Sequence, residues 1–378
     1  MLNIPVILVG AGAIGALWDT PDEVHCFTHA HAVLQHPSLT LHALIEPAPF
    51  TRQTALTRWG KHPEDGFASS EALFESPLGA TFFQHPTPWL VIASPDETHV
   101  PLLNLWLPRL PSGSVCIVEK PLGFSVRELE DALLLAKRRG VTLWVNYSRY
   151  FYPNHLTFIQ QHRASLGALL AWHVTYQRGF WHNASHGLHL LQLWHPHMST
   201  QCHSLGYAQV PDAHWDRLHP TDPTCTGAWL MKDTATSFQC QLLGLPSVFH
   251  GTSHDTLQVN LSDPSPEVTY VRTTFEVRGY FDHGMVSYSP EVLRLSTVSS
   301  QGLAHRMPPE VPNQVVFCKN QEARVFQMEA TQALPMLYQC AFSEVLGSSG
   351  HTAHLESLLN TAQLATRMTH TMSGISSG

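Results

Sequence analysis

The fold of this chain is decided by Ile4-Pro5-Val6-Ile7-Leu8-Val9-Gly10-Ala11-Gly12-Ala13-Ile14-Gly15. A short β-rich run ends directly on G-x-G-x-x-G, and an apolar, helix-compatible segment follows it. Gly10 permits a tight turn, Gly12 lets the backbone approach a pyrophosphate, and Gly15 lets the helix pack closely on the strand. Free N–H groups at the start of that helix would face the anion. The stretch therefore predicts the first strand, turn and helix of a dinucleotide-binding domain.

The second strand is predicted at 39–45, and it ends on Glu46. A carboxylate there can accept hydrogen bonds from the ribose hydroxyls of adenosine and would repel a 2′-phosphate, so NAD is favoured over NADP. The distance from Gly15 to Glu46 exceeds the usual ~20 residues. Asp19-Thr20-Pro21-Asp22 breaks the first helix, and we expect a new helix to begin with Thr28 as its N-cap.

Further strands are predicted at 89–93, 115–118 and 141–145. Between the last two, Ser125-Val126-Arg127-Glu128 forms a capping box at the head of a helix that ends near Gly140. Alternation of strands and helices over ~140 residues predicts a parallel, doubly wound α/β sheet of the Rossmann type. Ligands bind at the carboxyl ends of such strands. Residues there are expected to bind the cofactor: Gly10, Gly12, Ala13, Ile14, Gly15, Glu46, Ser94, Pro95, Thr98, His99, Glu119, Lys120 and Asn146.

The pattern changes near Tyr147, and we predict a Rossmann domain over 1–147 and a second domain over 148–378. Helix-like segments lie at 153–165 and 184–195, with a strand-like segment at 169–176 between them. After a Pro/His/Asp-rich loop at 210–224, seven strand-like segments alternate with turns, at 226–232, 235–243, 246–252, 255–261, 267–276, 284–288 and 292–297. A run of strands after a β/α half predicts an α+β domain with a large, mainly antiparallel sheet. A terminal helix is expected at 355–368 and can pack back on the first domain.

Composition excludes several classes of protein. The 378 residues suffice for two domains, and a net charge of −8 gives no basic surface for nucleic acid. The apolar runs are of strand length, well short of the ~20 residues of a membrane span, and the N-terminus reads as a strand and not as a signal peptide. Seven scattered cysteines without a Cys-x-x-Cys pair favour a reducing compartment. We expect a soluble, cytoplasmic protein.

Histidine is unusually frequent, with 26 residues. His182, His186 and His189 would share one face of a helix, and His195 and His197 follow, so a zinc site is conceivable. Neither a carboxylate nor a cysteine lies close by in the sequence to complete it, and the other histidines are spread along the chain. We therefore expect no metal.

Four motifs in the first ~150 residues, taken with their order and spacing, resemble the glucose-fructose oxidoreductase / inositol dehydrogenase / MocA (Gfo/Idh/MocA) family. They are G-A-G-A-I-G (10–15), A-S-P-D-E-T-H (93–99), E-K-P-L-G (119–123) and V-N-Y-S-R (145–149). The resemblance implies a nicotinamide-dependent oxidoreductase that acts on CH–OH groups. It also implies that one face of the second sheet forms a subunit interface, so a homodimer or homotetramer is expected.

The second half resembles the family more loosely, chiefly at 176–194. The pattern Y-x-x-G-x-x-x-N-G-S-H-x-x-D-L, typical of a branch found in bacterial surface-glycan and unusual-sugar pathways, is matched by Tyr176, Gly179, Asn183, Ser185 and His186. Ala184 replaces its glycine, and His189 stands at its aspartate. In this register His182 falls on the wider family's catalytic aspartate. A second register instead places Ser185, Gly187 and His189 on the wider family's D-x-G-x-H.

The resemblance assigns proton handling to Lys120 and His186. An ammonium group can donate to a carbonyl and stabilise developing alkoxide charge, and an imidazole suits general acid/base transfer. We expect hydride transfer to or from a secondary hydroxyl or ketone of a sugar, nucleotide-sugar or sugar-acid. Two alternatives stay open: an enzyme that retains NAD and cleaves glycosides through transient oxidation, and a non-catalytic nucleotide-binding regulator. Residues expected to contact the substrate are Asn183, Arg149, Tyr176, His182 and His189.

Overall fold

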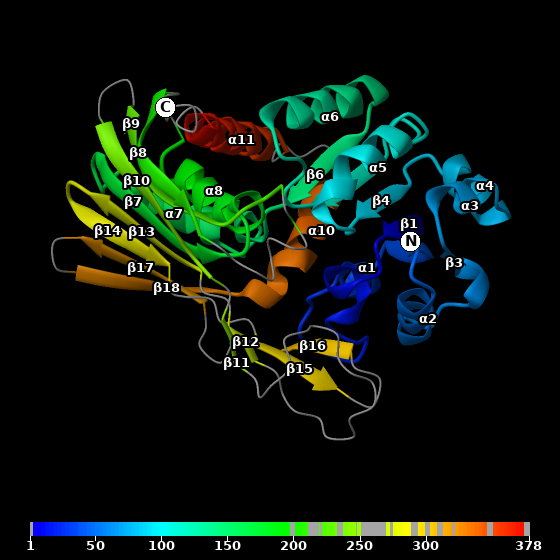
Figure 1. Ribbon diagram of the computed structural model, residues 1–378. Coiled ribbons are helices and arrows are strands. Elements are labelled where there is room, and N and C mark those ends of the chain that lie inside the picture. The colour runs from blue at the N-terminus through cyan, green and yellow to red at the C-terminus, as the bar shows by residue number, and fades with distance from the viewer. Residues whose placement is uncertain are drawn as a thin grey trace.

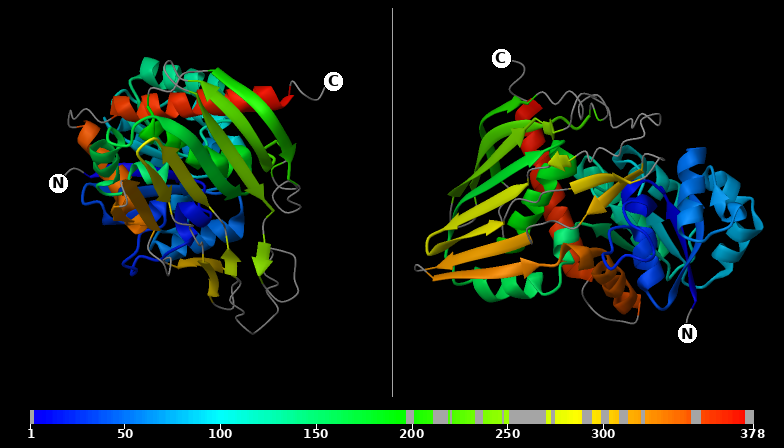
Figure 2. Two further views of the ribbon diagram at one scale, coloured as in Figure 1. Left: turned by 90° about the vertical axis from the view of Figure 1, so that its left-hand side faces the viewer. Right: turned by 90° about the horizontal axis from the view of Figure 1, so that it is seen from below.

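The computed structural model shows two large β-sheets, each with its own helices (Figure 1). It describes residues 3–196, 201–210, 219, 221–232, 237–246, 248–250, 270–272, 275–288, 294–298, 303–307, 313–319, 322–345 and 351–373. Figure 2 shows that the N-terminal sheet with its helices and the larger second sheet lie side by side, with the last two helices between them.

The first sheet is parallel and has the strand order β3-β2-β1-β4-β5-β6. Its strands are β1 (Ile4–Val9), β2 (Leu39–Ile45), β3 (Gly66–Phe67), β4 (Trp89–Ile92), β5 (Val115–Glu119) and β6 (Thr142–Asn146). All residues of β4 and β5 are buried, as the near-continuous apolar runs require when helices cover both faces. The chain reverses its direction of winding between β1 and β4, and ligands of doubly wound sheets bind at this point.

Helices join these strands: η1 (Ala13–Leu17), α1 (His29–Gln35), α2 (Pro49–Arg58), α3 (Ser70–Phe74), α4 (Pro77–Gln84), α5 (His99–Trp106) and α6 (Val126–Arg139). Three predicted helix boundaries are confirmed. The Thr28 hydroxyl caps α1 by accepting a hydrogen bond from the His31 backbone N–H at 3.2 Å. Ser125 caps α6 in the same way, and Gly140 ends it in the left-handed conformation.

The insertion before α1 is held by a buried carboxylate. Asp19, fully buried, accepts hydrogen bonds from the backbone N–H groups of Phe27 and Thr28, from the Thr28 hydroxyl and from Nδ1 of His31. Because a buried carboxylate is costly unless hydrogen-bonded, this set of donors stabilises the loop and fixes where α1 begins. The interrupted first helix predicted from the sequence is therefore a defined structure.

The second sheet has eight strands in the order β18-β17-β14-β13-β7-β10-β9-β8. They are β7 (Leu169–Gln177), β8 (Gln201–Gln209), β9 (Cys225–Lys232), β10 (Ser237–Leu245), β13 (Glu276–Phe281), β14 (Gly284–Tyr288), β17 (Asn313–Lys319) and β18 (Glu322–Met328). Only the β7–β10 pair is parallel among the pairings of this sheet, so the predicted mainly antiparallel sheet is confirmed. Two short pairs complete the described strands: β11 (Val248–His250) with β12 (Tyr270–Arg272), and β15 (Arg294–Val298) with β16 (Leu303–Met307).

One face of the second sheet carries helices, and the other is bare in the described part of the chain (Figures 1 and 2). The covering helices are α7 (His155–Arg163), α8 (Ser185–Trp194) and α11 (His351–Ser373). Trp172 and Val174 of β7 point to this covered face and are buried. Every residue of α8 is buried, which places that helix at the centre of the core.

The last two helices return to the first sheet. Tyr338 of α10 (Ala333–Val345) belongs to the same apolar cluster as Val6 of β1. Leu358 of α11 belongs to a second apolar cluster of the first sheet, where α11 contacts α6 and β6, whereas Met368, further along α11, packs in the core of the second sheet. Both cores are thus tied together by the C-terminal segment. Within the residues that the structure describes, no helix combines the length and apolar character needed to cross a membrane.

Several predicted strands of the second half differ from the structure. The described residues of 246–252 contain β11, and those of 267–276 contain β12 and the first residue of β13, which belong to different sheets. The segment 255–261 lies outside the described residues, as does most of the loop at 210–224. The two edge strands, β8 and β18, and the internal strand β17 are not predicted from the sequence.

Candidate active site

The glycine turn after β1 has the geometry that a nucleotide phosphate requires. Gly10 has φ +89°, and a Cβ added there would lie 2.5 Å from the Ser94 backbone nitrogen. A Cβ on Gly15 would lie 2.0 Å from the Gly10 carbonyl oxygen, whereas a Cβ on Gly12 would meet nothing within 4 Å. Gly10 and Gly15 are therefore required by packing, and Gly12 leaves the open space that a pyrophosphate needs.

Glu46 connects the end of β2 to this turn. Its Oε2 accepts a hydrogen bond from the Ala11 backbone N–H at 3.1 Å, and its Oε1 accepts one from the Ala48 N–H at 3.0 Å. The residue is half-buried, so the carboxylate keeps lone pairs for a ribose hydroxyl. The guanidinium of Arg52 donates to the Glu46 and Pro47 carbonyls beside it.

The loop after β4 places Ser94, Pro95 and Thr98 at the same edge of the sheet. The Ser94 and Thr98 hydroxyls lie 2.5 Å apart, and the Thr98 hydroxyl donates to the Pro95 carbonyl. His99 is fully buried, with Nε2 2.9 Å from the Ser94 carbonyl and Nδ1 2.7 Å from the Pro121 carbonyl. His99 thus holds this loop against the turn that follows β5, which makes its role in the structure indirect.

Glu119 and Asn146 end the neighbouring strands β5 and β6 and lie opposite each other in register. The amide of Asn146 donates to Glu119 Oε1 at 2.7 Å. Its own carbonyl oxygen, Oδ1, is buried without a hydrogen-bond partner. A buried acceptor without a partner is costly, and a ligand that donates to it would remove that cost.

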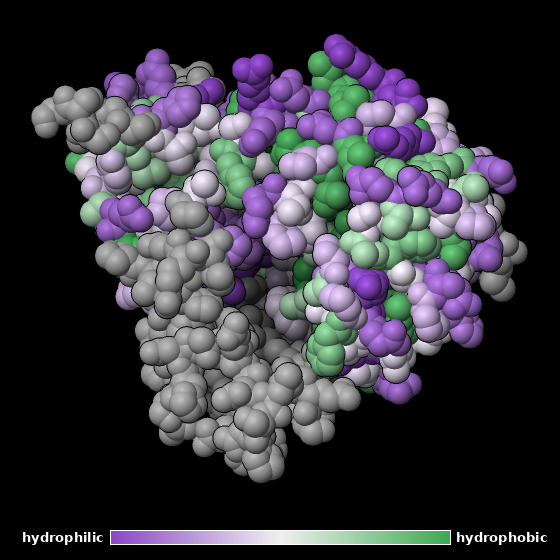
Figure 3. Space-filling view, turned by 45° about the vertical axis from the view of Figure 1, so that its right-hand side comes forward, coloured by the Kyte–Doolittle hydropathy of each residue, from purple (hydrophilic) through white to green (hydrophobic). Residues whose placement is uncertain are grey.

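These features fit a nicotinamide dinucleotide. The open space at Gly12 suits the pyrophosphate, Glu46 suits the adenosine ribose, and the free Oδ1 of Asn146 offers an acceptor to a hydroxyl or carboxamide N–H at the far end. Figure 3 shows a hollow in the surface between the two halves of the molecule.

Lys120 follows β5 and projects towards the second half of the chain. Its Nζ donates to the His182 carbonyl at 2.8 Å, and its peptide bond to Pro121 is cis. Burial lowers the pKa of Lys120, and the negative charges of Asp96 and Glu119 oppose that effect. An ammonium group so placed can donate a proton or stabilise a developing alkoxide.

Two carboxylates position His182, which lies in η5 (Phe180–Ala184). Its Nδ1 donates to Asp96 Oδ2 at 2.7 Å, and its backbone N–H donates to Asp222 Oδ2 at 2.9 Å. Asp222 also accepts from the Trp181 N–H, and burial raises its pKa to about 7. Burial and then the charge of Lys120 lower the pKa of His182 to about 4.

His186, in the first turn of α8, lies in an aromatic environment. Its ring packs edge-on against Tyr147 at 5.4 Å and against Phe275 at 6.1 Å between ring centroids. The Arg149 guanidinium lies 4.0 Å from the centroid of the same Phe275 ring. Burial, and then the charges of Arg149 and Lys120, hold the pKa of His186 well below its ordinary value. His186 is therefore a neutral imidazole at pH 7.

The other residues predicted to contact the substrate differ in their burial and in their hydrogen-bond partners. Asn183 is half-buried, and its amide donates to the Gln177 carbonyl at 2.6 Å. His189 lies behind Tyr147, stacked on it at 4.6 Å, with Nε2 2.9 Å from the Ser357 hydroxyl. Tyr176 is fully buried, and its hydroxyl bonds the backbone N–H and carbonyl of Cys225. A substrate role for Tyr176 stays a prediction that this burial does not support.

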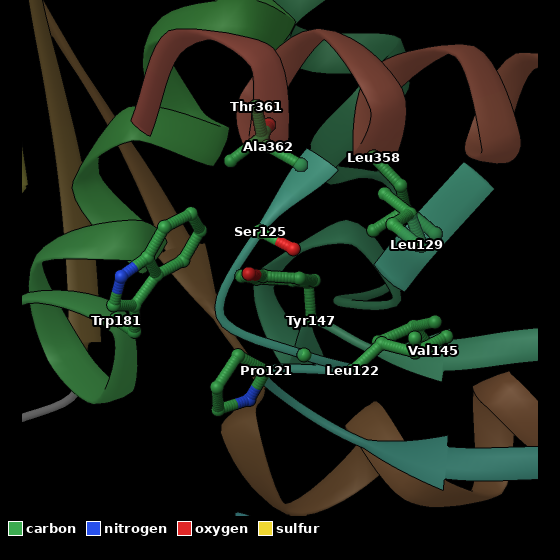
Figure 4. A pocket seen from close by; sticks show the side chains of 11 residues that line it. Pro121, Leu122, Ser125, Leu129, Val145, Tyr147, Trp181, Leu358, Thr361 and Ala362 are labelled. Carbon is green, nitrogen blue, oxygen red and sulfur yellow. The ribbon is translucent and has the colours of Figure 1, made fainter. Parts of the chain in front are cut away.

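A small pocket lies on the other side of the Lys120–Pro121 bond (Figure 4). Tyr147 lies in the middle, with Leu358 and Thr361 of α11 above it, Pro121 below it and Trp181 beside it. The lining is apolar except for hydroxyl groups. This pocket therefore borders the charged cluster around Lys120 but contains none of its charges.

In the part of the chain that the structure describes, His182, His186, His189 and His195 form no group of metal-type ligands, and His197 lies outside that part. Among the described residues, the group of metal-type ligands that comes within 4.8 Å of one another is Asp19, Cys26 and His31. Both oxygens of that carboxylate already accept hydrogen bonds from N–H and O–H donors. Burial raises the pKa of the Cys26 thiol far above its ordinary value, so the thiolate that binds metals is disfavoured. This group is a structural one.

Sequence reasoning missed Asp222 and did not assign roles to Asp96, Tyr147 or Phe275. Asp96 lies inside the quoted S-P-D-E-T-H motif, so its position beside the strand end was a usable signal. Asp222 lies in a loop that carried no recognisable motif, and only the three-dimensional structure brings it to η5.

Comparison with known proteins agrees with this geometry. The oxidoreductase family with an NAD-binding Rossmann fold (Gfo/Idh/MocA) matches residues 4–147. No curated protein matches the sequence. A solved structure of KijD10, a 3-ketoreductase from Actinomadura kijaniata, in complex with NADP is similar, with a TM-score of 0.64, 14% identity and 97% of each chain covered.

Two further structures share the fold. A Gfo/Idh/MocA family oxidoreductase from Vibrio cholerae has a TM-score of 0.59 and 14% identity, with 99% of this chain and 100% of that chain covered. A putative myo-inositol dehydrogenase from Sinorhizobium meliloti 1021 has a TM-score of 0.62 and 12% identity, with 98% of each chain covered.

The Rossmann fold, the glycine turn and the family match define the chain as an oxidoreductase that binds a nicotinamide dinucleotide, NAD(P). Residues 4–147 match the NAD-binding Rossmann domain of the Gfo/Idh/MocA family. Its class is that of the NAD(P)-dependent dehydrogenases and reductases.

Proposed function

We propose that this protein interconverts a secondary hydroxyl and a ketone on a sugar, nucleotide-sugar or sugar-acid, with Lys120 and His186 handling the proton. The observation that carries the proposal is the position of the Lys120 ammonium group. It lies at the carboxyl end of β5, in a partly buried site beside Asp96 and against the His182 carbonyl. The names of two structural neighbours, a 3-ketoreductase and a putative myo-inositol dehydrogenase, support the same reaction class.

In the direction of reduction, Lys120 delivers the proton. NADH, held at the Gly12 turn and Glu46, would supply the hydride when bound, and the Lys120 ammonium group would give its proton to the carbonyl oxygen. Asp96 and Glu119 favour the charged form of Lys120 against the effect of burial on its pKa. The resulting amine regains a proton from solvent before the next turnover.

In the direction of oxidation, the hydroxyl must lose a proton. His186 is neutral at pH 7 because burial and nearby cations lower its pKa, so it can accept one. Arg149, next to His186, can donate hydrogen bonds to substrate oxygens, and His182 and Asn183 offer polar groups at the opposite side of Lys120. This set of donors suits a ligand with several hydroxyl groups.

We propose NAD(H) as the preferred cofactor. The Glu46 carboxylate lies at the end of β2, where an adenosine 2′-phosphate would meet a negative charge. Arg52 is close, but its Nη1 already donates to two backbone carbonyls.

We also propose that the bare face of the second sheet joins copies of this chain. The strands β7, β10 and β13 point their alternate side chains away from the helices. These side chains include Ala171, His173, Thr175, Gln241, Leu243 and Tyr280, of which Leu243 is 49% exposed. A sheet face of mixed apolar and polar character that no helix covers suits a homo-oligomer interface.

The proposal is tested by cofactor titration and then by a panel of sugars and nucleotide-sugars. NADH should bind with quenching of tryptophan fluorescence. Lys120→Met should reduce turnover by about 10²- to 10⁴-fold while the Kd for NADH changes less than about threefold. Lys137→Met, on exposed α6, is the matched control and should behave as wild type. Binding of neither NADH nor NADPH, or full activity of Lys120→Met, would overturn the proposal.

A further inference from the structure

A second chain of polar groups lies behind the strand ends, on the side away from Lys120. Glu119 Oε1 is 2.9 Å from Nε2 of His29, and Nδ1 of His29 is 3.0 Å from the Tyr338 hydroxyl. His29 and Tyr338 are fully buried, and Glu119 is 8% exposed. The three residues come from α1, α10 and β5, so segments more than 300 residues apart meet at one carboxylate.

The hydrogen-bond roles in this chain follow from chemistry. A carboxylate only accepts, so Nε2 of His29 must carry the hydrogen that it donates to Glu119. In a neutral imidazole the other nitrogen is then an acceptor, and the Tyr338 hydroxyl donates to it. Tyr338 therefore selects the tautomer of His29 that can hold Glu119.

His29 and Tyr338, the two residues behind Glu119, are each held in place by their own element. His29 is the first residue of α1, whose start is fixed by the Asp19 loop and the Thr28 cap. The Tyr338 ring stacks on Trp89 of β4 at 5.9 Å between centroids. His29 and Tyr338 thus reach Glu119 from rigid elements, as a positioning group should.

On the front side, Glu119 belongs to the cofactor site. Asn146, with its unpartnered buried oxygen, donates to Oε1, and the Lys120 backbone N–H lies 3.3 Å from Oε2. The Glu119 carboxylate therefore places a negative charge in the part of the site that contains Lys120. That charge favours the oxidised cofactor, whose nicotinamide ring is positive, over the neutral reduced ring.

We infer that His29 and Tyr338 are positioning residues that keep Glu119 ionised and in place, and that they thereby set the relative affinity of the site for NAD⁺ and NADH. This inference rests on the proposed cofactor. Burial alone would raise the pKa of Glu119, but the hydrogen bond that His29 donates leads the opposing influences, and the pKa of Glu119 is lowered. In a variant without His29, we expect the effect of burial to dominate and to raise the pKa of Glu119. Each unit by which the pKa then exceeds the working pH reduces the ionised fraction about tenfold.

The test measures affinity and not turnover. Kd values for NAD⁺ and NADH are determined by calorimetry and fluorescence for wild type, His29→Phe, His29→Gln and Tyr338→Phe. His29→Phe removes the donor and should raise the ratio Kd(NAD⁺)/Kd(NADH) about tenfold, chiefly by weakening NAD⁺. His29→Gln keeps an N–H donor and should restore most of the wild-type ratio. Tyr338→Phe should raise the ratio about two- to fivefold, since it removes only the group that selects the tautomer.

The controls separate this inference from the proposed function and from simple destabilisation. His31→Gln lies in the same helix but contacts Asp19, so it should lower the melting temperature without changing the ratio. If His29→Phe fails to fold, the Kd ratios of Tyr338→Phe and His29→Gln still test the inference. A ratio that stays at the wild-type value in the folded His29 and Tyr338 variants overturns the inference. Failure of the wild type to bind either nucleotide overturns the proposed function instead.

Discussion

Asp96→Asn should lower the pKa of Lys120. Asp96 accepts a hydrogen bond from His182 at 2.7 Å, and its side chain is 11% exposed. Burial by itself would raise the pKa of Asp96, but the His182 hydrogen bond and the nearby charges of His182 and Lys120 outweigh it and lower the pKa to about 2. A shift of about two units from 3.8 corresponds to about 2–3 kcal/mol in favour of the carboxylate.

That free energy is shared among His182, Lys120 and, least of the three, His99, and linkage makes it reciprocal: the carboxylate raises the pKa of each group that lowers its own. If Lys120 receives somewhat less than half, Asp96→Asn should lower its pKa by about 0.5–1 unit. The ammonium form, which serves reduction, is present below the Lys120 pKa and is lost as pH rises through it. The variant should therefore lose the reducing activity at a lower pH than wild type does.

The pKa can be measured without a substrate. The chain has five lysines, at positions 61, 120, 137, 232 and 319, so reductive ¹³C-methylation yields a small set of dimethyl-lysine NMR signals. The Lys120 signal is assigned with Lys120→Arg and followed from pH 5 to 11. Glu97→Gln is the matched control, because Glu97 is a neighbouring but exposed carboxylate. A folded Asp96→Asn protein whose Lys120 titrates within about 0.2 unit of wild type would refute the electrostatic reasoning.

Two further predictions concern the cofactor and the assembly. Glu46→Ser should weaken NADH by about three- to tenfold and bring NADPH to comparable affinity, because the repulsion of a 2′-phosphate is removed; unchanged preference for NADH in paired titrations would contradict the role of Glu46. Leu243→Glu should shift the mass measured by light scattering towards that of one chain, whereas Leu134→Glu, an exposed residue on α6, should not. Equal masses for the Leu243 and Leu134 variants would place the interface elsewhere.

Local chemistry made much of the first sheet predictable. Thr28, Ser125 and Gly140 signal helix boundaries through their own hydrogen bonds and backbone conformations, and the structure confirms all three. Strands buried on both faces read as apolar runs, so β4 and β5 were visible in the sequence. The turn at Gly10 was likewise predictable, since only a glycine tolerates its φ of +89° so close to Ser94.

The second sheet was harder to predict, for physical reasons. β8, with the sequence Q-C-H-S-L-G-Y-A-Q, is an edge strand with mostly exposed or half-buried residues, so it lacks the apolar alternation that marks an internal strand. The candidate site was also hard to predict, because its residues are far apart in the sequence. Asp222 acts on backbone N–H groups 40 residues earlier in the chain, and His29 meets Tyr338 across 309 residues. Such contacts leave no periodic pattern in either segment.

The abundance of histidine shows how the environment of a side chain decides its role. Burial and neighbouring cations lower the pKa of His182 to about 4 and hold that of His186 well below its ordinary value, so both are neutral at pH 7. Lys120 beside them is supported as a cation by Asp96 and Glu119. In the proposed reaction, Lys120 would serve as the proton donor and the neutral imidazoles as proton acceptors, as reversible interconversion of an alcohol and a ketone requires. Residue counts cannot show this, because the separation of pKa values arises from which charges the fold places beside each group.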